Sequence, residues 1–206
     1  IARVNADRLA AISPDPDLMW FASDAGLALL HAGSTAGARA WFDVARLVVS
    51  DTEPNAALAI LKLWAPLVMG VSDNPLPMSP AALTDWWSGV VSLDPAQAQN
   101  IGSVVLTTFE AVGLDVPADA WDSFTGFAAP VLVERPSVGA LRSLANAASA
   151  GRIGETVLLS LVILGEAHPA EVDAYTVSRV IAALMAVGLV DEARSLALEA
   201  IVGRSL

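Results

Sequence analysis

The chain of 206 residues contains no cysteine, which excludes disulfide bonds, thiol nucleophiles and zinc sites with thiolate ligands. Charged residues are also scarce, at 16% of the chain, against about 25% in ordinary domains. A membrane-spanning helix needs roughly 20 mostly apolar residues. The longest stretch without a formal charge, residues 95–109, has 15 residues and includes several polar ones. The sequence therefore predicts no transmembrane segment.

Basic residues are few: eleven stand against twenty-two acidic ones, and the net charge is −11. Phosphate backbones repel such a chain, so we expect no general nucleic-acid binding. Between Lys62 and Arg135 there is no basic residue at all, although this stretch contains eight acidic ones. Two interpretations stay open here: a solvated face that keeps an apolar protein soluble, or a surface that receives a basic peptide or helix.

Glycine and proline recur along the chain with a regular spacing. The glycines are 37 to 43 residues apart and the prolines 33 to 41: Gly33, Gly70, Gly113, Gly151 and Gly188, and Pro16, Pro54, Pro95, Pro136 and Pro169. One apolar segment of helix length lies between each glycine and its neighbouring proline. This punctuation predicts an all-α fold, a right-handed superhelical array of about five helical hairpins without a sheet.

The segments between these residues give about ten helices. We place them near residues 17–32, 35–50, 54–70, 79–92, 95–112, 117–133, 136–150, 152–166, 169–187 and 189–203. Residues 131–133 and 157–164 could instead form short strands, but each lies within a unit of helix length. We expect residues 1–206 to form a single α-solenoid domain with a loop insertion near 71–80. The charged, helix-like first residues indicate a piece of a longer protein.

Two segments share the pattern G-x4-A-R-x5-A, namely residues 33–45 and 188–200, and residues 151–156 are a looser third copy. This pattern resembles the tetratricopeptide repeat, in which small residues after a turn glycine let two helices pack closely. The resemblance implies an α-solenoid in which Ala38 and Ala193 are buried at the hairpin contact. The spacing here exceeds the roughly 34 residues of that family, and an irregular helical bundle is the alternative.

Five residues are candidates for partner binding. Trp86 and Trp87 are adjacent, so on a helix their side chains point in different directions. They form either an aromatic anchor for a partner or the core of a helix that is buried on two faces. Asp115, Asp119 and Asp122 belong to the acidic stretch and would contact a basic partner.

No catalytic, cofactor-binding or metal-binding residues are expected. His31 and His168 lie at expected helix ends, where a capping role is favoured over a metal site. The sequence thus predicts a non-enzymatic scaffold or adaptor for protein–protein interaction. Alternatives are an accessory domain of an enzyme whose catalytic part lies elsewhere, and a helical domain that binds an apolar ligand. The 55% apolar composition also predicts an exposed apolar patch, covered by a second copy or by flanking helices.

Overall fold

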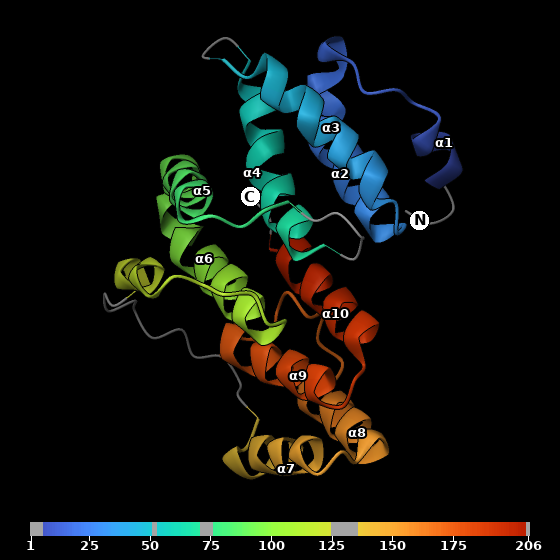
Figure 1. Cartoon of the computed structure of the whole chain (residues 1–206), viewed down its shortest axis with the longest axis vertical. Coiled ribbons are helices and arrows are strands. Elements are labelled where there is room, and N and C mark those ends of the chain that lie inside the picture. Colours follow the sequence, from blue (N-terminus) through green and yellow to red (C-terminus); the bar gives the residue numbers. More distant parts are fainter. Residues whose placement is uncertain (1–5, 51–52, 71–75, 125–135, 205–206) are drawn as a thin grey trace. The chain divides into compact units, whose positions relative to one another are not determined.

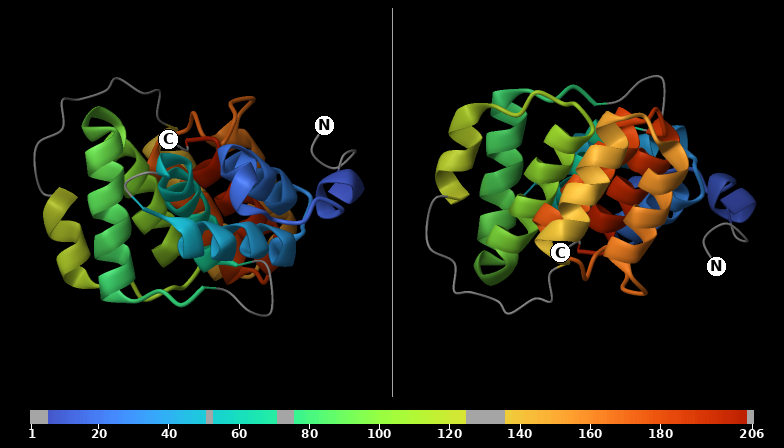
Figure 2. Two further views of the ribbon diagram at one scale, coloured as in Figure 1. Left: turned by 90° about the horizontal axis from the view of Figure 1, so that it is seen from above. Right: turned by 90° about the horizontal axis from the view of Figure 1, so that it is seen from below.

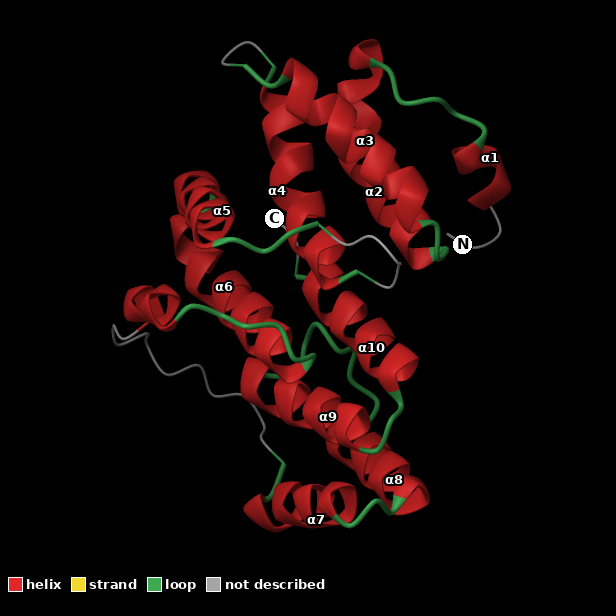
Figure 3. Cartoon of the chain, in the orientation of Figure 1, coloured by secondary structure: helices red, strands yellow, loops and turns green. Residues whose placement is uncertain are grey.

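The computed structural model describes residues 6–50, 53–70, 76–124 and 136–204, and within them every regular element is a helix (Figure 3). More than two thirds of these residues are helical, which confirms the all-α prediction. Among the described helices, none combines the length and apolar character that a membrane span requires. The chain divides into two compact units, one ending at Val90 and the other beginning at Val91.

The first unit is built on three helices that all contact one another: α2 (Met19–His31), α3 (Thr35–Val48) and α4 (Pro54–Met69) (Figure 1). The short α1 (Ala6–Ala10) and the 3-10 helix η2 (Pro16–Leu18) precede them. Gly26 of α2 permits the close approach of α4, since a Cβ there would lie 2.5 Å from Leu63 Cδ1. Most of α5 (Pro80–Leu93) also belongs to this unit.

The second unit contains α6 (Pro95–Ala111), the 3-10 helix η3 (Ala118–Phe124), α7 (Val138–Ser149), α8 (Ile153–Leu164), α9 (Ala174–Ala186) and α10 (Val190–Val202). Helix α9 contacts α6, α7, α8 and α10, and the right-hand view of Figure 2 shows the helices from α7 to α10 side by side. Its Val177, Val180 and Ile181 are fully buried. Helix α9 therefore organises this unit, and α6 packs on it across a long sequence separation.

The recurring glycines end helices as the sequence predicts. All five have a positive φ, from 39° at Gly70 to 87° at Gly113, a conformation that disfavours side chains with a Cβ. Ala38 and Ala193, five residues after their turn glycines, are both completely buried, which confirms the predicted hairpin contact. The pattern in the sequence thus locates both the turns and the small residues beside them.

Of three further predicted segments, only the first differs from the structure. The predicted helix 117–133 is a 3-10 helix over Ala118–Phe124, and its remaining part lies outside the described residues. Residues 71–75 of the predicted loop at 71–80 also lie outside them, residues 76–79 form no regular element, and α5 begins at Pro80. The alternative strand at 157–164 is part of helix α8.

The predicted helix 169–187 begins only at Ala174, because the preceding residues satisfy their polar groups in a turn. The Glu171 N–H donates to the His168 carbonyl at 2.7 Å, and the Ala170 N–H donates to Nδ1 of His168 at 3.2 Å. Asp173 then caps α9 by accepting the Thr176 N–H at 3.1 Å. His168 therefore stabilises a turn, and the capping role that the sequence favoured for it belongs to Asp173.

Arg204, which follows α10, also stabilises the turn before α9. Its guanidinium donates hydrogen bonds to the carbonyl oxygens of Ala170 and Val172. Burial lowers the pKa of Arg204, and the nearby Asp173 carboxylate acts in the opposite direction. The two carbonyls receive donors here that a helix would otherwise have supplied, so the segment before α9 is stable without being helical.

Candidate functional site

Trp86, one of the predicted partner-binding residues, is only 5% exposed. Its ring stacks on that of Trp64, with centroids 5.4 Å apart and planes inclined by 27°. Its indole N–H donates to the carbonyl oxygen of Leu61 at 3.1 Å, which fixes α5 against α4. Trp87 is half-buried, with its ring centroid 6.5 Å from that of Trp86. Trp86 thus belongs to the packing of the first unit rather than to an open surface.

Asp115, Asp119 and Asp122, the predicted acidic site, are all exposed. Asp119 and Asp122 lie on η3, and Asp115 precedes it. No group of three or more side chains of the metal-ligating types gathers there or elsewhere in the described part of the chain. These aspartates belong to the second unit and the two tryptophans to the first. A basic partner that binds both sets therefore stays a prediction.

A pocket of about 560 Å³ lies in the first unit. Its walls come from α3, α4, the start of α5 and the segment just before α5. Most of the lining is apolar and includes Phe42, Trp64 and Trp86, which are nearly inaccessible to solvent. The volume is within the range of about 300–1,000 Å³ typical of small-molecule sites. The sequence did not reveal this pocket.

The charged residues of this pocket are Arg39, Arg46 and Asp85. Arg39 is engaged within α3, because its Nε lies 3.0 Å from the Asp43 carboxylate. The guanidinium of Arg46 lies over the Phe42 ring, 6.0 Å from its centroid, and makes no ion pair with any residue that the structure describes. Asp85 is on α5, so the α3 side of the pocket is its positive side.

In the second unit, helix α8 has an unusual distribution of side chains. It buries Thr156 and Ser160, whereas Leu158, Leu161 and Val162 are 66%, 62% and 73% exposed. A surface helix of a globular protein normally turns its apolar stripe inward and its polar face outward. We call Leu158, Leu161 and Val162 the α8 face.

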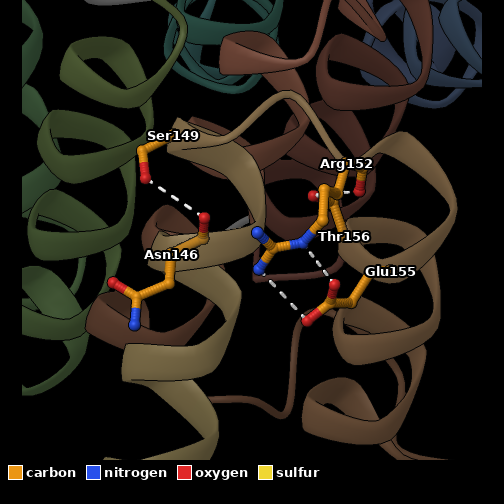
Figure 4. Close-up of polar contacts among 5 residues, drawn as sticks. All are labelled: Asn146, Ser149, Arg152, Glu155 and Thr156. Carbon is orange, nitrogen blue, oxygen red and sulfur yellow. Dashed lines mark hydrogen bonds and ion pairs between the residues drawn. The ribbon is translucent and has the colours of Figure 1, made fainter.

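The buried polar residues of α8 need no partner from another helix. The Thr156 hydroxyl donates to the Arg152 carbonyl at 3.0 Å, and the Ser160 hydroxyl donates to the Thr156 carbonyl at 2.8 Å. Figure 4 shows the first of these two bonds, from Thr156 to the Arg152 carbonyl, and the two hydrogen bonds that Arg152 makes to Glu155. Because these polar groups are satisfied locally, the inward side of α8 packs as an apolar surface would.

The sequence contained one signal for the α8 face that periodicity alone did not expose. From residue 156 to residue 165 there is no charged side chain, so a helix there has no charged face to offer to solvent. The pocket had no comparable signal, because its lining comes from three separate helices.

Comparison with protein-family models, with curated proteins and with solved structures finds no match for this chain. The pocket and the α8 face are therefore the features from which a function can be inferred.

Proposed function

We propose that this chain is a non-enzymatic scaffold for protein–protein interaction, built from tetratricopeptide-like helical hairpins, and that the α8 face receives an apolar helix of another protein. The observation that supports this function is the exposure of three large aliphatic side chains on a helix that buries Thr156 and Ser160. Helical-hairpin proteins present extended surfaces to partners. Contiguous apolar exposure on a protein surface marks such sites.

The spacing of the α8 face favours a helical partner. Leu158, Leu161 and Val162 follow the i, i+3, i+4 pattern by which one helix packs against another. There is no charge between Glu155 and Glu166, so the contacting side of the partner is expected to be apolar rather than basic. Covering a large aliphatic side chain completely contributes about 1.5–3 kcal/mol. Three partly exposed ones do not offset the cost of association by themselves, so a stable partner must bury surface beyond α8.

A site-specific photo-cross-linker tests the proposal in the full-length protein in its natural host. We expect benzoylphenylalanine at Leu161 to cross-link to an identified segment of another protein, a helix with an apolar face. The same group at Ser143, an exposed position of α7, is the matched control and should give no such product. Adding Leu158→Glu and Val162→Glu should abolish the cross-link. Absence of any product at Leu161, or cross-links only to a second copy of this chain, would contradict the proposal.

A further inference from the structure

We infer that the pocket of the first unit binds a small amphipathic monocarboxylate, with its apolar body against Trp64 and Trp86 and its carboxylate on Arg46. Small-molecule sites are typically apolar cavities with a few placed polar groups that orient the ligand. A pocket of about 560 Å³ with aromatic walls and an arginine at one side has this construction. The pocket belongs to the first unit and the α8 face to the second.

The aromatic walls are already fixed in place. Trp86 is held by its stacking on Trp64 and by its hydrogen bond to the Leu61 carbonyl. Helix α5 approaches α4 closely at Gly89, where a Cβ would lie 2.4 Å from Leu61 Cδ2. Ligand binding therefore requires little further ordering of the protein, and the small loss of conformational entropy favours affinity. Trp64 and Trp86 are 6% and 5% exposed, so they offer a ligand only the small part of their surface that borders the pocket.

The charges select an anion and limit it to one negative group. The protein has a net charge of −11, yet two of the three charged residues of the pocket are arginines. Arg39 is occupied by Asp43, which leaves the Arg46 guanidinium as the group that a carboxylate can join. Asp85 on the opposite helix would repel a second negative charge. A monocarboxylate therefore fits better than a dicarboxylate or a phosphate ester.

Arg46 is exposed, so replacing it should not disturb folding. Isothermal titration calorimetry with naphthalene-2-carboxylate and its neutral isostere naphthalene-2-carboxamide separates the apolar contribution from the ionic one. We expect the intact protein to bind the carboxylate at least about tenfold more tightly, as an added charged hydrogen bond implies. Arg46→Gln should remove this preference and leave the binding of the carboxamide unchanged. Arg142→Gln, an exposed arginine of α7, is the matched control and should keep the preference.

Three outcomes would overturn the inference. Failure of both compounds to bind would show that the pocket is not a ligand site. Equal affinity of the intact protein for the two compounds would show that it does not select an anion. A preference that survives in Arg46→Gln, with an unchanged circular dichroism spectrum, would place the recognition of the carboxylate elsewhere.

Discussion

The hairpins α2–α3 and α9–α10 belong to different units but are built alike. Each contains the pattern G-x4-A-R-x5-A, and both turn glycines, Gly33 and Gly188, have a φ of 84°. The residue after each glycine donates its N–H to the carbonyl five residues earlier, at 2.8 Å from Ser34 and 3.0 Å from Leu189. The pattern thus specifies a complete local structure, a turn together with the packing of the helix that follows it.

The hairpins differ in what surrounds them. Helices α2 and α3 both pack on α4, whereas α9 contacts α6, α7 and α8 as well as α10. The arginine after the first alanine of the pattern, Arg39 or Arg194, has different surroundings in the two hairpins. Arg39 pairs with Asp43 on an accessible helix face, but the Nε of Arg194 is buried and has no hydrogen-bond partner among the described residues. The glycine and alanines therefore define the hairpin, while the arginine has no fixed role in it.

The hairpin α7–α8 extends the comparison to the looser third copy. Gly151 has a φ of 67°, and Thr156 occupies the place of the first alanine and is completely buried. Its hydroxyl is satisfied by the Arg152 carbonyl, so a polar residue substitutes for alanine without an unsatisfied group. The geometry of the hairpin thus tolerates a change that weakens its signature in the sequence.

The largest expected effect comes from enlarging the two equivalent alanines. Ala38→Leu and Ala193→Leu should each destabilise the protein by about 1–3 kcal/mol, because each inserts a larger side chain into a filled contact. Urea denaturation followed by circular dichroism measures this loss. Five of the six tryptophans lie before Val90, so their fluorescence reports mainly on the first unit. It should respond more to Ala38→Leu than to Ala193→Leu.

Exposed alanines on the same hairpins provide the controls for this experiment. Ala36→Leu on α3 and Ala186→Leu on α9 should change stability by less than about 0.5 kcal/mol, as expected for surface positions. If Ala38→Leu and Ala193→Leu behaved like these controls, the two hairpins would not share the contact that the pattern predicts.

Local features of this fold could be predicted from the sequence because single residues determine them. The turn glycines, the prolines that open α4 and α6, and the buried Ala38 and Ala193 all follow from backbone conformation or side-chain size. The late start of α9 could not be predicted in this way. It depends on donors from Arg204, more than 30 residues away.

The candidate sites were harder to predict, for two physical reasons. The pocket requires α3, α4 and α5 to meet, and no periodicity within one helix reveals that Arg46, Trp64 and Trp86 face the same cavity. On α8, Thr156 and Ser160 would ordinarily mark the solvent side, but their hydroxyls bond to the backbone of their own helix. Leu158, Leu161 and Val162 therefore remain on the exposed side of α8.

An intermediate effect is expected at the turns. Gly33→Ala and Gly188→Ala should each cost about 1–2 kcal/mol, since a Cβ is disfavoured at a φ of 84° even though nothing lies within 4 Å of it. Gly154→Ala is the matched control, because Gly154 is in α8 and also has free space around it. There the same substitution should stabilise the helix by about 0.4–1 kcal/mol. Equal effects at all three positions would show that the turn glycines are not required for their conformation.

The smallest expected changes in stability come from replacing the two arginines of the pattern, Arg39 and Arg194. Arg39→Met should destabilise by about 0.2–1 kcal/mol, the usual contribution of a partly exposed ion pair, and 1 M salt should abolish the difference. Arg194→Met should be neutral or stabilising by up to about 1 kcal/mol, because it removes a buried donor that has no acceptor. Arg179→Met, at an exposed position of α9, serves as the reference in the same urea titrations. Equal, salt-sensitive losses for Arg39→Met and Arg194→Met would mean that the arginine has one role in both hairpins after all.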